Sequence, residues 1–531
     1  MFPRSMLKSI GAPLASFSNV WCSTTARAPA ALRPAALADE CHDGNLSSAV
    51  TRPRPFEDMP GPRALPIIGT QWMHYPGGPL YGMTRRDKYA RLQELYGDVI
   101  KENIVPGILT LVHVFNPRDI ETIFRHEGKY PIRQAFFMLK RYNEKYNNNV
   151  SGVLSSQGVD WYNVRSQVQK KITNPKFVNS HTNSQQVVAD DFVEWIRKRR
   201  NQDDVIEDIL PYLYRYSTEA IGVVCFNRRV GALDDALDVE SEAHAFITAV
   251  SEVTTATHSE LDSWFLFLYF DTPLFSRFKK AHDVIRRISL KYAQRLLEET
   301  TDMATEHDME RGKLIPYLLK ETSLSEAHVL TIVSECFFAG VDTTSHCLGF
   351  TLYNLCKNPE AMERLVTEIH QFLPDHSPVS SETLGKMTYL RAVIKESLRL
   401  NPVTAGNGRT NSTELVLSGY TVPAGMYLGL HTDLSAQQDD FVDDAHSFRP
   451  ERWLRDDDLH LKPRPFTYLP FGFGKRSCPG KRLAEQEVSL ALIKILQNFE
   501  VRYRHDVDME YDVHLLNTPL TPLKFSFTDL K

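Results

Sequence analysis

The sequence lacks several features that would place it in common protein classes. It has no hydrophobic run approaching the roughly 20 residues that a helix needs to cross a bilayer. It has seven cysteines in 531 residues, an odd number with no CxxC pair and no metal-site spacing. These absences argue against a membrane-spanning helix, a disulfide scaffold or a metal site built from several cysteines, and they favour a reducing compartment.

Strong charge of either sign is also missing. The net charge is −5, so the chain has no basic excess that would indicate a nucleic-acid partner. Hydrophobic residues make up 42% of the chain, which is enough for a large core. Beyond residue 58 we find no internal repeat and no low-complexity linker.

The N-terminal segment lacks acidic residues altogether. Residues 1–37 contain only basic charges, namely Arg4, Lys8, Arg27 and Arg33, with serines among apolar positions. This composition resembles a mitochondrial transit peptide, although a disordered tail is the alternative. We therefore expect residues 1–50 to be a transit peptide and linker. Residues 51–531 would form one large domain, entered through a stiff proline-rich hinge at 59–69.

Periodicity predicts a mainly α-helical domain with a smaller β-rich part. Helical periodicity is clear over 192–200 and 281–299. Alternating or β-branched segments at 109–115, 414–428 and 523–527 predict strands.

One predicted helix is unusually long. The capping-box pattern SLSE at 323–326 predicts its start, and the apolar sequence runs to about Lys357, so the helix should pass through the interior. Its middle carries the sequence AGVDTT at 339–344, which conflicts with helix propensity and should bend the helix locally. Such a conflict often marks a functional site, and a packing notch against a neighbouring helix is the alternative.

A glycine-rich loop near the C-terminus is the most informative motif. Residues 471–480 read FGFGKRSCPG, with Cys478 between glycines that allow close backbone approach. A single thiolate so placed suits haem iron as an axial ligand, and Arg476 suits a cofactor carboxylate. The alternative is a buried structural cysteine. The register resembles the haem-binding loop of the cytochrome P-450 family at Phe471, Gly474, Arg476, Cys478 and Gly480.

The resemblance extends over residues 56–529 and implies a cytochrome P-450 haem-thiolate catalytic domain. It implies haem b as cofactor, with Cys478 as the axial iron ligand. Asp342 and Thr343 would then be catalytic residues that deliver protons for cleavage of dioxygen. Trp161, Arg165 and Arg409 match family positions that reach the haem propionates, although Trp161 and Arg165 alone could be a surface cation–π pair.

Two further charged groups match the family. Glu396 and Arg399 lie one helical turn apart, and the resemblance implies a buried structural triad of these two residues with Arg452. A basic set resembles the ferredoxin-docking residues of the mitochondrial branch, although ordinary helix-surface charge is the alternative. This set comprises Arg391, Lys395, Lys481 and Arg482.

These matches predict a mitochondrial haem-thiolate monooxygenase at the matrix side of the inner membrane. Its electrons would come from NADPH through a ferredoxin reductase and an adrenodoxin-like ferredoxin. Segments 102–107, 129–133 and 271–275 resemble arthropod mitochondrial members, including ecdysteroid hydroxylases, so a lipophilic steroid is the expected substrate. The apolar run 264–270 could enter a membrane surface, or it could be a buried core helix.

Three alternatives to this function remain open at the level of sequence. The first is a detoxifying monooxygenase that acts on foreign compounds. The second is a haem-thiolate isomerase that needs no redox partner, which the retained Asp-Thr pair disfavours. The third is a non-catalytic haem or lipid carrier.

Overall fold

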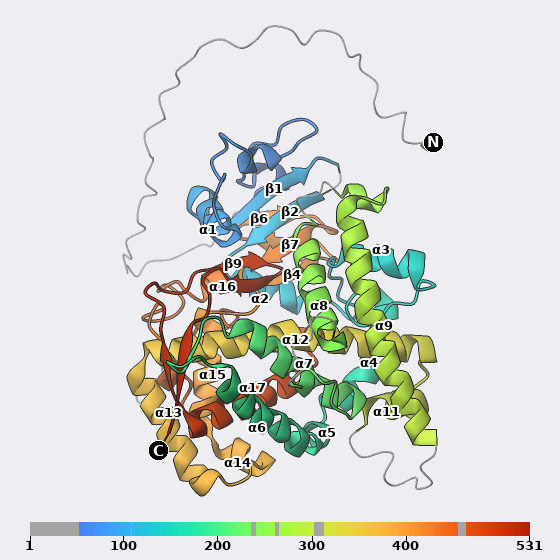
Figure 1. The fold of residues 1–531 in the computed structure, drawn as a ribbon. Helices are drawn as coiled ribbons and strands as arrows, with labels where there is room; N and C mark the ends of the chain where they lie inside the picture. The colour runs from blue at the N-terminus through green and yellow to red at the C-terminus, as the bar shows by residue number, and fades with distance from the viewer. Residues whose placement is uncertain are drawn as a thin grey trace, which may run out of the picture. The chain divides into compact units, whose positions relative to one another are not determined.

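The computed structural model describes most of the chain after the N-terminal segment. The expected transit peptide and Trp264 of the apolar run lie outside the described residues. Residues 53–531 form a unit of their own, in which helices outnumber strands as predicted (Figure 1). The described ranges are 52–107, 109–234, 241–260, 265–301, 313–454 and 463–530.

The helices are spread along the chain and include both predicted segments, which fall within α6 and α9. None of the helices in the described ranges combines the length and apolarity needed to cross a bilayer. Their bounds are α1 Arg85–Tyr96, α2 Pro117–Arg125, α3 Phe137–Tyr146, α4 Gly158–Ile172, α5 Pro175–Ser180, α6 Thr182–Arg199, α7 Leu210–Phe226, α8 Glu242–His258, α9 Pro273–Thr301, α11 Leu314–Glu321, α12 Glu326–Lys357, α13 Pro359–Phe372, α14 Ser381–Lys386, α15 Thr388–Leu400, α16 Thr432–Ser435 and α17 Lys481–Asn498.

The β part consists of a four-stranded sheet in the order β1-β2-β7-β4, a three-stranded sheet β3-β11-β8 and two hairpins, β5-β6 and β9-β10. Strand β2 pairs in parallel with β7, and Leu111 lies opposite Tyr427. The hinge at 59–69 is non-helical, as predicted, and the Lys101 amide of β1 donates to the Pro60 carbonyl at 2.8 Å. The strands are β1 Val99–Val105, β2 Leu109–Val114, β3 Val205–Ile206, β4 Asn407–Thr410, β5 Leu415–Leu417, β6 Tyr420–Val422, β7 Tyr427–Leu430, β8 Phe499–Tyr503, β9 Tyr511–His514, β10 Leu516–Pro519 and β11 Phe525–Asp529.

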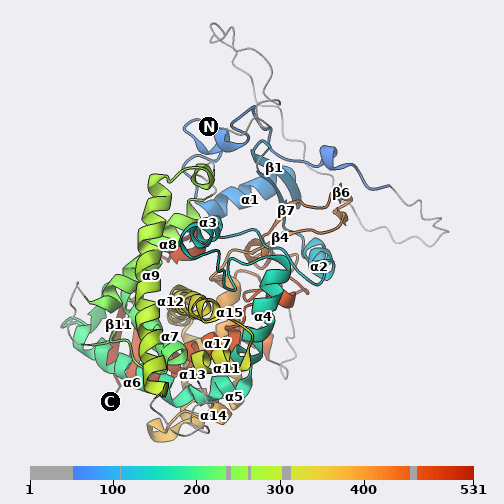
Figure 2. The same cartoon turned by 90° about the vertical axis from the view of Figure 1, so that its right-hand side faces the viewer.

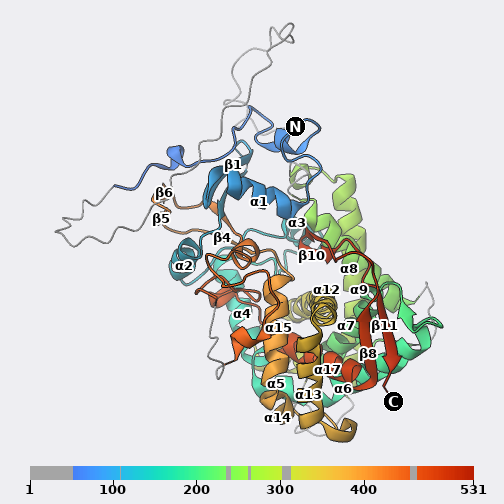
Figure 3. The same cartoon turned by 90° about the vertical axis from the view of Figure 1, so that its left-hand side faces the viewer.

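Helix α12 passes through the middle of the helical part, where Figures 2 and 3 show it along its axis among α7, α15 and α17. It runs over 32 residues without interruption, so the polar run does not break it. The predicted cap at Ser323 is wrong by two residues. Ser325 is the N-cap, and its hydroxyl oxygen accepts from the His328 amide.

The two halves of α12 pack into different hydrophobic cores. In the N-terminal half, residues such as Val333 and Phe337 pack with α8 and α9, for example with Phe246. In the C-terminal half, residues such as Leu348 and Leu352 pack in the core that holds α6, α15 and α17. The polar run 342–346 therefore lies where one apolar core gives way to the other.

The sequence-predicted triad is assembled in a buried position. Glu396 on α15 receives Nη2 of Arg399 at 2.7 Å and Nε of Arg452 at 2.9 Å, and all three side chains are almost fully buried. The Trp453 indole also donates to Glu396 at 2.8 Å. The other guanidinium nitrogens of the two arginines donate to backbone carbonyls; for example, Nη1 of Arg399 donates to the Ala445 carbonyl at 2.6 Å. Each buried charge is thus both paired and hydrogen-bonded, as a low-dielectric site requires.

We predict that Glu396→Gln destabilises the fold strongly, because it leaves two buried arginines without a counter-charge. The expected loss in unfolding free energy is roughly 3–5 kcal/mol. The matched control is Glu382→Gln, since Glu382 pairs with Lys386 at 2.8 Å on the surface, where ion pairs contribute only about 0–1 kcal/mol. Denaturant unfolding of both variants measures the difference, and equal losses would contradict the structural role of the triad.

Candidate functional site

Cys478 lies in a turn between the short helix η7 (Gly474–Arg476) and α17. Its amide donates to the Phe471 carbonyl at 2.8 Å and closes the loop. Gly472 and Gly474 have φ of 69° and 71°, a left-handed conformation that glycine adopts without strain. A side chain at 474 would also collide with Glu127, because its Cβ would lie 2.2 Å from a carboxylate oxygen. The loop geometry therefore requires glycine at both positions.

The Cys478 sulfur receives backbone hydrogen bonds from the amides of Gly480 and Lys481 at the start of α17. Burial raises the pKa of this thiol, whereas these amides, Arg165 and Arg133 lower it. The residue nevertheless keeps exposed surface. The Cys478 thiol is therefore surrounded by protein atoms and yet remains accessible to a ligand. A bound cation would hold it as the thiolate.

Arg476 is buried beside the thiol and crosses to the loop that precedes α4. Its Nε donates to the Pro131 carbonyl at 2.9 Å, and Nη2 donates to the Ser156 carbonyl at 3.0 Å and to Oε1 of Gln157 at 2.9 Å. The guanidinium stacks on Trp161, with 4.1 Å between its carbon and the ring centroid. Nη1 has no hydrogen-bond partner among the described residues and is available to a ligand.

Trp161 and Arg165 share helix α4 but have different partners. The cation over the Trp161 ring is Arg476, so the suggested Trp161–Arg165 surface pair is wrong. Arg165 is buried, and its Nη2 donates to the Ser477 carbonyl at 2.6 Å, which ties α4 to the cysteine loop. Burial lowers the pKa of Arg165 to about 10.

Arg409 on β4 is buried and forms an ion pair with Glu127 at 2.7 Å. Its Nη2 also donates to the Phe473 carbonyl at 3.3 Å. Its Nη1 donates to the Gly408 carbonyl at 2.8 Å, so all three guanidinium nitrogens are held by the protein itself.

The site holds more buried positive charge than the protein neutralises. Arg133, Arg165, Arg409 and Arg476 interact with one another, and burial together with its neighbours lowers the pKa of Arg476 to about 9. Glu127 is the carboxylate that forms an ion pair within this group. Arg133, like Arg476, has a buried guanidinium nitrogen without a partner among the described residues. A ligand with two carboxylates beside an accessible thiol matches this donor set, so the residues fit haem.

The polar run of α12 presents its side chains in two directions. The Thr343 hydroxyl donates to the Ala339 carbonyl at 2.8 Å and stays partly accessible. The Asp342 carboxylate is buried, and Oδ2 accepts from Thr254 of α8 at 2.6 Å. It also accepts from Tyr214 of α7, and burial with this contact raises the pKa of Tyr214. Asp342 and Thr343 are therefore adjacent in sequence but not hydrogen-bonded to each other.

The four basic residues expected at a docking surface lie around a single carboxylate, that of Glu485. Burial raises the pKa of Glu485, whereas Lys481, Lys395, Arg482 and Arg391 each oppose this shift. Arg391 and Lys395 belong to α15, and the other two begin α17 directly after the cysteine loop. The structure thus brings all four cations together around Glu485, and two of them directly follow the cysteine loop in the chain.

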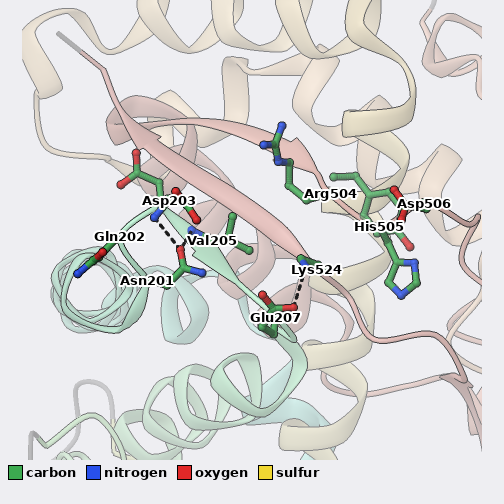
Figure 4. A pocket seen from close by; sticks show the side chains of 11 residues that line it. Asn201, Gln202, Asp203, Val205, Glu207, Arg504, His505, Asp506 and Lys524 are labelled. Carbon is green, nitrogen blue, oxygen red and sulfur yellow. Dashed lines mark hydrogen bonds and ion pairs between the residues drawn. The ribbon is translucent and has the colours of Figure 1, made fainter.

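A depression of about 740 Å³ lies elsewhere, at the sheet formed by β3, β11 and β8 (Figure 4). Its wall mixes acidic and basic side chains, and Lys524 pairs with Glu207 at 2.8 Å. It contains no residue of the cysteine loop, so we do not assign the chemistry to it.

Several residues of the site were missed in the sequence. Arg133, Glu127 and Gln157 stand in loops or at a helix end, where a single side chain carries no periodic signal. Glu335 on α12 was missed as well, because it reads as one more polar residue on a long helix. The only sign of it in the sequence was an acidic residue two turns before Asp342 within the apolar run, and the structure shows that this residue is buried.

Comparison with known proteins agrees with this site. The family model described as Cytochrome P450 matches residues 59–527. The chain is 31% identical to "Probable cytochrome P450 12a5, mitochondrial" of Drosophila melanogaster over 498 residues, 90% of this chain and 91% of the relative. It is 30% identical to "Cytochrome P450 CYP12A2" of Musca domestica over 519 residues (93% and 95%). It is 29% identical to "Cytochrome P450 302a1, mitochondrial" of Drosophila melanogaster over 489 residues (90% and 96%).

A mainly helical fold around one enclosed cysteine and a cluster of arginines defines a haem-thiolate enzyme. The chain belongs to the cytochrome P450 family and is a monooxygenase with haem as its cofactor. When bound, the haem activates dioxygen so that one oxygen atom enters the substrate. The residues that would hold the haem are Cys478, through its thiolate, and the surrounding arginines, while α12 runs between the two cores.

Proposed function

We propose that this enzyme is a mitochondrial monooxygenase that hydroxylates a steroid-like substrate. Electrons would reach it one at a time from NADPH through a flavoprotein reductase and an adrenodoxin-like ferredoxin. The observation that carries the redox assignment is the group of four cations around Glu485, namely Arg391, Lys395, Lys481 and Arg482, two of which directly follow the cysteine loop in the chain. A positive surface there suits an acidic one-electron carrier and would steer its docking.

Location in the mitochondrion is supported by the names of relatives and by the transit-like composition of residues 1–50. Peripheral contact with the inner membrane from the matrix side is supported by the segment before α9. There Leu266, Tyr269 and Phe270 are each more than half exposed, while Phe265 and Phe267 are buried. The segment is therefore not the buried core helix considered from the sequence. Exposed apolar side chains of this kind can enter the headgroup region.

We assign the haem to Cys478 as axial ligand and to the surrounding cations and loop residues. Arg476 and Arg133 offer unpartnered nitrogens to the propionates, with Arg165 and Arg409 completing the positive charge. Asp342 and Thr343 would deliver protons to the dioxygen. The carboxylate of Asp342 would have to turn from Thr254 and Tyr214 to do so.

We predict that Thr343→Ala uncouples electron use from hydroxylation, because the hydroxyl that passes protons is lost. Product formed per NADPH should fall by about tenfold or more, with peroxide released instead. The matched control is Thr331→Ala on the same helix, since Thr331 makes the same bond to the carbonyl four residues earlier, at 2.8 Å. Product, peroxide and NADPH are measured together, and unchanged coupling in Thr343→Ala would count against the proton relay.

We predict that Arg391→Glu combined with Arg482→Glu weakens ferredoxin docking without altering substrate binding. Both side chains are exposed, so the change reverses surface charge and leaves the core intact. The KM for ferredoxin should rise by about tenfold or more, and the salt dependence of turnover should diminish. Arg502→Glu, an exposed charge change on β8, is the control. Equal KM values in both variants would place the docking surface elsewhere.

The substrate assignment is supported by the arthropod-like segments 102–107, 129–133 and 271–275 and by the apolar character of candidate pocket residues such as Phe338 on α12. Such a pocket suits a lipophilic molecule with few polar groups.

We predict that an ecdysteroid precursor shifts the Soret band of the haem-loaded enzyme from low spin to high spin, because it displaces water from the iron. Absorbance titrations with ecdysteroid precursors, vitamin D sterols, cholesterol and insecticides make the comparison. A shift with foreign compounds and with no steroid would support the detoxifying alternative. Turnover of a hydroperoxide without any reductant would support an isomerase.

A further inference from the structure

We propose that Glu335 of α12 is a positioning residue that fixes the segment 152–157 and, through it, the orientation of Arg476 toward the haem. The inference rests on the assignment of Arg476 to the cofactor made above. Glu335 does not touch the thiolate loop. It acts from the opposite side, where the segment crosses the long helix.

The Glu335 carboxylate is held by backbone rather than by a cation. Its side chain is 6% exposed, and Oε2 accepts from the Leu154 amide at 2.9 Å. The amides of Gly152 and Val153 and the Ser155 hydroxyl also face the carboxylate. Among the described residues Glu335 forms no ion pair, although Arg133 interacts with it electrostatically, and Oε1 has no hydrogen-bond partner. Successive amides around one acid form a concave anion site built by the main chain.

Close approach of this segment depends on glycine at position 152. A Cβ there would lie 2.3 Å from Oε2 of Glu335 and 2.4 Å from its Cδ. No ordinary contact is that short. A larger residue would have to displace either the carboxylate or the segment.

The other end of the segment holds the cofactor-side residues. The Ser156 carbonyl and Oε1 of Gln157 accept from Arg476, at 3.0 and 2.9 Å. Gln157 also joins the backbone of Arg133 through two hydrogen bonds, at 3.0 and 2.7 Å. Six residues thus connect the carboxylate of α12 with two arginines of the cradle.

The polar nature of Glu335 calls for an explanation beyond packing. Burial raises the pKa of this carboxyl to about 7, so its charge is held at a cost. An apolar residue of the same volume would fill the space without that cost. The acid is explained if its hydrogen bonds to the segment are what the site needs.

A double-mutant cycle between Gly152 and Glu335 tests this inference in the full-length haem-loaded enzyme. The variants are Gly152→Ala, Glu335→Ala, their combination and Glu335→Gln, with Glu326→Gln at the exposed start of α12 as the matched control. The readouts are the rate of haem transfer from ferric enzyme to excess apomyoglobin and the thermal midpoint of the apoprotein.

Each single alanine variant should release haem about 10-fold to 100-fold faster, as loss of an outer-shell support does for bound metals. The combination should release haem no faster than Glu335→Ala alone, because removing the carboxylate leaves room for the new methyl group. Glu335→Gln keeps the length and one acceptor oxygen, so it should retain haem better than Glu335→Ala even if the latter folds poorly. Glu326→Gln should match the wild type.

Wild-type haem retention in Gly152→Ala would overturn the inference, since the carboxylate would then be free to move aside. Purely additive effects of the two alanines would overturn it as well. Arg476→Leu separates the two assignments. If this variant loses haem rapidly while the Gly152 and Glu335 variants do not, the inference about Glu335 alone fails. If Arg476→Leu retains haem, the assignment of Arg476 to the cofactor fails, and the role of Glu335 fails with it.

Discussion

Burial of the middle of a single 32-residue helix is the constraint on which the rest of the structure depends. Between its exposed ends the helix is largely surrounded by protein, so each buried polar group on it needs a partner inside the molecule. Helix α12 meets much of this demand by passing between two apolar cores and placing polar residues at their boundary, although Oε1 of Glu335 and Oδ1 of Asp342 have no hydrogen-bond partner among the described residues. There the Asp342 carboxylate accepts a hydrogen bond from the Thr254 hydroxyl. The hydroxyls of Thr344 and Ser345 donate to the side chains of Glu487 and Ser217, respectively. The polar side chains of α12 therefore lie at the boundary of the two cores, where neither core requires an apolar side chain.

The buried arginines form two groups, which differ in how fully the protein satisfies their guanidinium nitrogens. In the triad, Glu396 and several carbonyls saturate Arg399 and Arg452, and nothing is left for a ligand. In the cradle, Arg409 pairs with Glu127 and Arg133 interacts with Glu335, yet single nitrogens of Arg133 and Arg476 have no partner among the described residues. The first arrangement is complete without a cofactor. The second is complete only with one, which is why the fold and the haem should stabilise each other.

Local spacing explains what could be predicted from the sequence. The cysteine loop, the Glu396–Arg399 turn and the polar run in α12 are short patterns whose residues lie near one another in the chain. The missed residues depend on contacts between distant segments. Arg133 and Gln157 matter because they meet Arg476 more than 300 positions later, and Glu335 matters because residues 152–155 fold onto it. The same limit explains why the stacking of Arg476 on Trp161 was missed, since the cation and the ring are more than 300 positions apart in the chain.

The parallel pairing of β2 with β7 has a consequence for how the chain is made. Strand β2 pairs on one side with β1, which is close in sequence, but its second edge finds a partner only when residues 427–430 are present. Until then β2 has an open edge, of the kind that templates association between chains. A loop of this length also closes slowly, because the entropy of closing it is lost before the contacts between distant segments can stabilise the chain. The N-terminal sheet is therefore among the last parts of the molecule to assemble. A chain truncated before residue 427 would keep this unpaired strand edge, which makes it a target for chaperones and proteases.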